Sequence, residues 1–199
     1  MHFTKTVLLF AGIAAAAPIA ASTGSVASSS SSAQGTAPAA LSSAVLNDIN
    51  AWVTSIDGAL SAVNAFTGGP SIAAQGFAVA AAGDGLLRTT SQLISDTRTL
   101  SNYGPIEAVY SAMYTDLITN YVAGNLIRLF QALQNKKALF NQVGAAKDMV
   151  NGISALSSMF LQLADIEELL LTESDMDKVH NAAINIFIAL QSAVQAYSS

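Results

Sequence analysis

The chain has 199 residues, no cysteine and a formal net charge of −5, and only 11% of its residues are charged. The lack of cysteine excludes disulfide staples, thiol catalysis and Cys-ligated metal sites. A net negative charge disfavours nucleic acid and anionic lipid surfaces as partners. Because soluble domains usually carry about 25% charged residues, the folded surface must be covered largely by small and neutral polar side chains.

Residues 1–16 are predicted to form a signal peptide. His2 and Lys5 precede an apolar run at residues 7–17, which has the length of a signal-peptide core and is too short to cross a bilayer. Small residues favour cleavage between Ala16 and Ala21. We therefore expect a secreted protein, located in the medium or the cell wall, with no membrane-spanning segment.

Residues 17–40 are predicted to be a disordered linker. They are rich in Ser and Ala, include an unbroken serine run at residues 28–32, and lack the large apolar side chains that offset ordering entropy. Clustered Ser and Thr in an exported chain are typical of O-glycosylated segments. A plain flexible spacer is the alternative.

Residues 41–199 are predicted to form the folded domain. The first segment has apolar residues three and four positions apart, which indicates a helix that ends at the Gly-Gly-Pro turn of residues 68–70. The second segment begins near Ser71 and extends to about Leu100. Its glycines predict a kink around residues 83–85.

Three further amphipathic segments follow. The third spans about residues 105–142 and ends at Gly144, and the fourth has helical apolar spacing from Met149 to Leu170. The last segment opens at Ser174, with Asp177 three residues later in a capping-box pattern. With no alternating strand pattern, the fold class is predicted to be all-α, an antiparallel bundle of about five long amphipathic helices.

Few residues are suited to catalysis. His180 is the single histidine left after leader removal, and general-base catalysis would need a nucleophile and an orienting group to converge on it from elsewhere. We interpret it as a surface or capping residue. The acidic residues around it lack the ligand spacing and glycine of a calcium loop. We therefore expect no enzyme activity, no metal and no cofactor.

Two groups of residues allow either a ligand or a purely structural role. Four tyrosines recur with spacings of seven, four and seven, which places them on one helical face, either at a pocket mouth or apolar surface or at a helix seam. Lys136 and Lys137 could pair with a fatty-acid carboxylate or complement a helix dipole. The four tyrosines are Tyr103, Tyr110, Tyr114 and Tyr121.

Short motifs across residues 41–199 carry a family resemblance. They are Asp48-Ile-x-x-Trp-Val-x-x-Ile-Asp57, Lys136-Lys137-x-x-Phe140-x-x-x-Gly144 and the terminal Ala196-Tyr197. In these motifs the chain resembles the fungal hydrophobic surface binding protein A family, also called the cell wall galactomannoprotein family. The resemblance implies a secreted helical bundle. Some members adsorb to hydrophobic surfaces and assist secreted polyester-degrading esterases, and others bind fatty acids in an internal pocket.

The leading hypothesis is a secreted, non-catalytic protein that binds apolar molecules. The partner is a fatty acid or other lipid inside the bundle, or an extended hydrophobic surface outside it, with a secreted esterase as a further partner implied by the resemblance. The alternative is a structural cell-wall mannoprotein with no small-molecule ligand. The candidate ligand-binding residues are Ile56, Leu60, Leu93, Ile118, Phe160 and Phe187.

Overall fold

The computed structural model describes residues 37–198, all of whose regular elements are helices. The predicted signal peptide and residues 17–36 of the predicted linker lie outside the described residues. The first described helix begins at Ala39, and Ala37 before it is buried against the core. The last residues of the predicted linker are thus part of the described structure.

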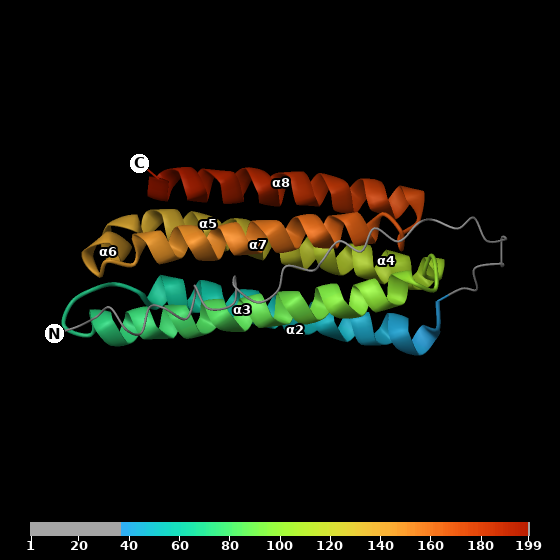
Figure 1. The fold of residues 1–199 in the computed structure, drawn as a ribbon, viewed down its shortest axis with the longest axis horizontal. Coiled ribbons are helices and arrows are strands. Elements are labelled where there is room, and N and C mark those ends of the chain that lie inside the picture. The colour runs from blue at the N-terminus through green and yellow to red at the C-terminus, as the bar shows by residue number, and fades with distance from the viewer. Residues whose placement is uncertain (1–36, 199) are drawn as a thin grey trace, which may run out of the picture.

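Long helices make up most of the described chain, and the prediction of an all-α bundle is confirmed (Figure 1). Where a single third segment was expected, the structure has three α-helices and a π-helix, so that prediction was too simple. The elements are α2 (Ala39–Ala65), α3 (Ile72–Ser101), α4 (Ala108–Leu117), the π-helix η2 (Ile118–Val122), α5 (Ala123–Asn135), α6 (Lys137–Gln142), α7 (Ala146–Glu167) and α8 (Glu173–Ser198).

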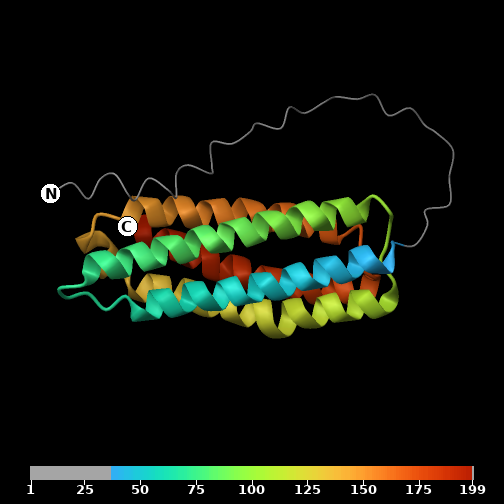
Figure 2. The same ribbon diagram turned by 90° about the horizontal axis from the view of Figure 1, so that it is seen from below.

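The long helices close into a ring. Helix α2 packs against α3, α3 against α7, α7 against α8, and α8 against α5, which returns to α2. Consecutive long segments run in opposite directions, whereas the ring neighbours α3 and α7, α8 and α5, and α5 and α2 run the same way (Figure 2). A ring of this kind leaves an axial space that inward side chains must fill, and ligand sites in bundles are built there.

Turns at the expected positions set the helix lengths. Helix α2 ends where Gly68 and Gly69 adopt φ of 86° and 79°, a left-handed backbone that favours glycine. Helix α3 runs unbroken through residues 83–85, so the glycines there do not interrupt it. Helix α8 begins at Glu173, and Thr172 donates to Asp175, two positions before the predicted capping pair.

Aromatic side chains fill the end of the bundle that contains α6. The ring centroids of Phe66 and Phe140 are 4.7 Å apart, and those of Phe140 and Tyr197 are 6.1 Å apart. The Tyr197 hydroxyl donates to the Leu133 carbonyl at 2.6 Å. Two of the short motifs therefore meet in space, and their aromatic residues hold the end of α8 against α5 and α6.

Candidate functional site

A small cavity lies between four helical elements in the half of the bundle opposite α6, and we call it the inner cavity. Its volume is about 30 Å³. Trp52 and Phe160 form part of its wall, with ring centroids 5.7 Å apart. The lining is apolar except for one carboxyl group, and it consists of Trp52, Ile118, Val122, Phe160, Leu163, Ala164, Glu167, Val179, Ala183, Ile186 and Phe187.

The π-helix forms one side of the inner cavity. Ala123 N–H donates to the Ile118 carbonyl, five residues back, and Ile118 and Val122 both line the cavity. The wider π turn changes the direction in which its own side chains point, so Tyr121 within it is 51% exposed, while Tyr114 before it is buried. The predicted single tyrosine face is therefore wrong. Single π turns are frequent at functional sites.

A second cavity lies further along the bundle axis, with a volume of about 40 Å³. Its walls come from α2, α3, α5 and α7, and every lining side chain is apolar or absent. Gly83 and Gly152 are part of the wall. Leu156 lines this cavity and Phe160, one helical turn later, lines the inner cavity. The two cavities therefore follow each other along α7.

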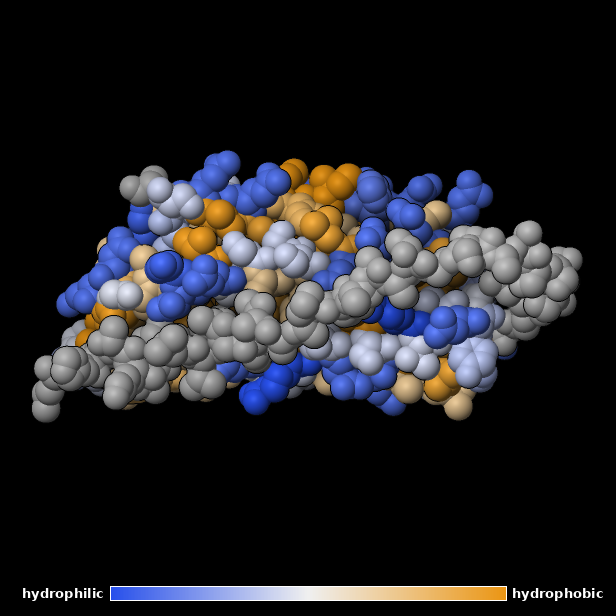
Figure 3. Space-filling model, in the orientation of Figure 1, coloured by the Kyte–Doolittle hydropathy of each residue, from blue (hydrophilic) through white to orange (hydrophobic). Residues whose placement is uncertain are grey.

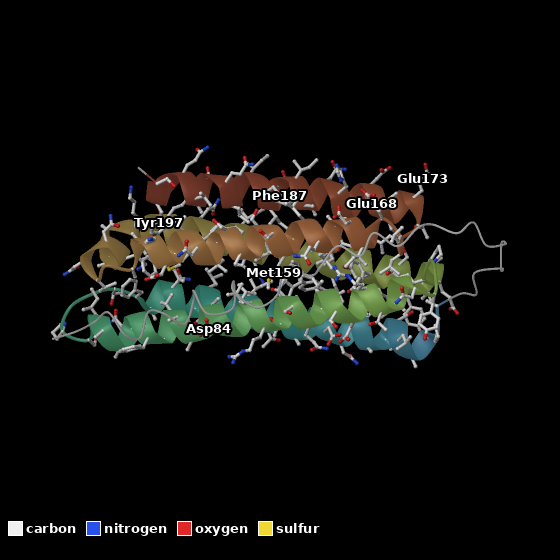
Figure 4. All side chains as sticks on the ribbon, viewed as in Figure 1. Asp84, Met159, Glu168, Glu173, Phe187 and Tyr197 are labelled. Atoms are coloured by element: carbon white, nitrogen blue, oxygen red, sulfur yellow. The ribbon has the colours of Figure 1, made fainter. Side chains whose placement is uncertain are left out.

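A surface depression lies outside the inner cavity, with a volume of about 290 Å³ between the end of α7 and the start of α8. Ala164, Glu167, Val179 and Ala183 line both spaces, so these four residues separate the inner cavity from solvent. In Figure 4, Glu168 lies at the end of α7 near the first turns of α8, and Phe187 points from α8 toward the helices beneath it.

Glu167 is a buried carboxyl on this shared wall. The Tyr114 hydroxyl donates to Glu167 Oε1 at 2.5 Å. Burial raises the pKa of Glu167 to about 7, although the hydrogen bond from Tyr114 lowers it. Burial and the neighbouring Glu167 raise the pKa of Tyr114 well above its usual value. The pair therefore places a carboxyl that titrates near neutral pH beside an apolar cavity.

The six predicted ligand-binding residues are found in three different environments. Ile118, Phe160 and Phe187 line the inner cavity. Ile56 and Leu93 are fully buried in the core but line neither cavity. Leu60 is half-buried and lines a separate, polar depression of about 350 Å³ on the outside, together with Asn64, Arg128 and Lys136.

Sequence reasoning overlooked two residues of the site. Trp52 and Glu167 both line the inner cavity, and neither is among the predicted ligand-binding residues. The signal for Glu167 was present, because Phe160, Leu163 and Glu167 are three and four residues apart and share one face of α7. A carboxyl on an apolar stripe indicates a buried polar group that needs a partner, and Tyr114 supplies it.

The polar cluster at the same end of the bundle is structural. Asp175 accepts hydrogen bonds from Ser111 and Thr172 and pairs with Lys178 at 3.0 Å. The bonds from Ser111 and Lys178 lower the pKa of Asp175. Across residues 37–198, no group of three or more His, Asp or Glu side chains is arranged to hold a metal ion. No helix in this part of the chain is long and apolar enough to span a bilayer.

Comparisons with known proteins identify the fold. No model of a known protein family matches the chain, and no curated protein matches it either. The structure is similar to AFMP4P in complex with palmitic acid, with a TM-score of 0.72 and 20% identity over 78% of this chain and 99% of that one. It is also similar to the two ligand-binding domains of the Penicillium marneffei MP1 protein.

Both domains of the Penicillium marneffei protein are complexed with arachidonic acids. Domain 1 matches with a TM-score of 0.67 and 14% identity, over 80% of this chain and 97% of that one. Domain 2, with multiple arachidonic acids, matches with a TM-score of 0.66 and 14% identity, over 80% and 96%. At these identities the comparisons show a shared all-α fold.

Proposed function

We propose that this protein binds single-chain lipids, such as fatty acids, between the helices of its bundle. The observation that carries the proposal is the pair of apolar cavities that follow each other inside a ring of helices. Support comes from three solved structures with this fold, which are complexes with palmitic or arachidonic acid. An apolar tail leaves water most favourably where the surrounding side chains are apolar.

Binding requires the bundle to expand. The two cavities hold about 30 and 40 Å³, whereas pockets that enclose drug-sized ligands hold roughly 300–1,000 Å³. Helices α7 and α8 are suited to such a movement, because their shared wall at Ala164 and Ala183 is made of small side chains. A tail that enters here reaches Phe160 first and the second cavity after it.

The sequence supports export of this activity. The predicted signal peptide at residues 1–16 and the family resemblance support a location outside the cell, in the medium or the wall. The scarcity of catalytic residue types supports a non-catalytic binder. The resemblance would add a secreted esterase as a partner. That enzyme would act on the apolar material to which the bundle binds.

Adsorption to an apolar surface is the second form of the proposal. Apolar side chains gather near the middle of the upper half of the face in Figure 3, over α7 and α8, with hydrophilic side chains around them. The exposed large apolar residues here are Leu161 of α7, Ile184 and Ile188 of α8, and Leu169 in the turn between the two helices. Their mixture with polar residues favours single lipids over extended surfaces as the main ligand.

We expect Ala183→Phe to weaken lipid binding by at least tenfold. Ala183 lines both the inner cavity and the depression, so a phenyl ring there occupies the path of the tail. The control is Leu60→Phe, which adds a ring of similar size to the outer polar depression and should leave the affinity nearly unchanged. Titration with a fluorescent fatty acid at pH 6 measures both, and circular dichroism verifies the fold.

Other results of the binding measurements would contradict or replace the proposed function. Equal affinity of a folded Ala183→Phe variant and the wild type would contradict binding through this wall. Absence of lipid binding by the wild type, together with adsorption to polystyrene, would replace the internal site with surface binding. Absence of both would support a structural wall protein.

A further inference from the structure

The wall between the inner cavity and the depression contains one ionisable side chain that reaches both spaces. Glu167 is 7% exposed, and its Oε1 accepts a hydrogen bond from the Tyr114 hydroxyl. The salt bridge found in residues 37–198 joins Lys178 to Asp175 and does not involve Glu167. A buried carboxylate without a cation is costly, so the neutral form is favoured.

The other charged groups near Glu167 do not neutralise it. Within the described residues, the titratable side chains that line the depression with it are Glu168, which directly follows α7, and Asp177 and His180 of α8. No charged residue of α2, α3 or η2 lines either space. His180 is exposed.

The charged side chains of the neighbouring elements are exposed or have other partners. Asp48 of α2 is bonded to Asp96 of α3, and Arg98 in the last turn of α3 is exposed. The Asp175 carboxylate of α8 is engaged by Ser111, Thr172 and Lys178. Asp116 of α4 and Asp165 of α7 are exposed. In the described part of the chain, the pair of Glu167 and Tyr114 at the wall of the cavity therefore has no cationic side chain as a partner.

We propose that the Glu167 carboxyl, held by the Tyr114 hydroxyl at this wall, receives the polar head of the bound lipid and admits at most one negative charge between itself and that head. This proposal rests on the proposed lipid-binding function and names the head-group chemistry of that site. A tail directed from Glu167 toward Phe160 and the second cavity is buried in apolar surroundings, while the head remains next to the depression.

The protonation state of Glu167 determines which lipid head groups can bind. A neutral Glu167 can donate its proton in a hydrogen bond to a lipid carboxylate, so the two carboxyl groups share one proton. An ionised Glu167 repels that carboxylate, because two like charges in one buried site cannot both ionise readily. Fatty-acid binding therefore takes up one proton above neutral pH. An alcohol head can donate to the carboxylate or accept from the acid, so it binds in either state.

The test compares palmitic acid with hexadecanol between pH 6.0 and 8.5 by displacement of a fluorescent lipid, below the aggregation limit of each. Because Glu167 has a pKa of about 7, its neutral fraction should fall roughly thirty-fold over this range, and the affinity for palmitic acid should fall with it. Hexadecanol affinity should change by less than about threefold, since its head stays uncharged.

Three variants complete the experiment. Glu167→Gln keeps the shape and a donor, so palmitic acid affinity should become nearly independent of pH. Tyr114→Phe removes the bond that lowers the Glu167 pKa, so the loss of affinity should begin at higher pH. His180→Gln is the matched control within the depression and should keep the wild-type pH profile.

Several results would overturn the proposal. It fails if the wild-type affinity for palmitic acid is constant across the range, if hexadecanol shows the same loss, or if Glu167→Gln keeps the loss. In each of these cases lipid binding itself survives. If neither lipid displaces the probe at any pH, the proposed function fails together with this inference.

Discussion

Replacing Trp52 by alanine is expected to lower the free energy of unfolding by about 3–5 kcal/mol, the usual cost of truncating a buried aromatic side chain. Trp52 is 2% exposed and packs against Phe160 with centroids 5.7 Å apart. Its removal would join new empty volume to the inner cavity. For a domain of this size the melting temperature should fall by roughly 10 °C.

Urea unfolding followed by circular dichroism measures this loss. Phe77→Ala is the matched control, because Phe77 lies on α3 and is 47% exposed, and its truncation should cost less than about 1 kcal/mol. Equal losses for the two variants would contradict the central position of Trp52. An expanded cavity should also bind small apolar molecules, which would restore part of the stability by mass action.

Glu167→Gln is expected to stabilise the protein at alkaline pH. Burial raises the pKa of Glu167 from 4.5 to about 7 in the folded state. The neutral side chain is therefore fully favourable below pH 4.5, and its contribution is lost as pH rises through 7. A difference of 2.5 pKa units corresponds to about 3 kcal/mol, so the variant should be more stable than the wild type by up to that amount at pH 8.

The comparison must be a difference between two pH profiles. Burial and the nearby Asp96 raise the pKa of Asp48 to about 6, which destabilises both proteins over a similar range. The lowered pKa of Asp175 acts in the opposite sense at acidic pH, again in both. Urea midpoints from pH 4.5 to 8 should therefore diverge steadily, and a constant difference would contradict the buried, cation-free environment of Glu167.

The helices were predictable because their amphipathic patterns are local. Val63 of α2 and Ile153 of α7 each belong to a stripe of apolar residues with helical spacing. The glycines at residues 68, 69 and 144 have a left-handed backbone and end the segments where expected. The π-helix was not predictable, since a bond from Ala123 to Ile118 depends on how that helix packs against its neighbours. Tyr121 lies inside this turn and is exposed, whereas Tyr114 lies before it and is buried.

The site was only partly predictable for a related reason. Ile56, Leu60 and Val63 share a broad apolar face of α2, and the sequence cannot show which edge of that face points to the axis of a closed ring. The structure places Ile56 and Val63 in the core and Leu60 at the outer depression. Glu167, by contrast, was recognisable from its place on the stripe of Phe160 and Leu163.

The proposed site places a lipid tail beside Trp52, which is the single tryptophan of the chain and lines the inner cavity. Bromine atoms quench indole fluorescence only at close range, so a dibrominated stearic acid reports contact directly. Titration at pH 6 should quench Trp52 in a saturable manner, while unbrominated stearic acid should not, and Ala183→Phe should suppress the effect. Saturable binding of the brominated acid without quenching of Trp52 would contradict a tail inside the bundle.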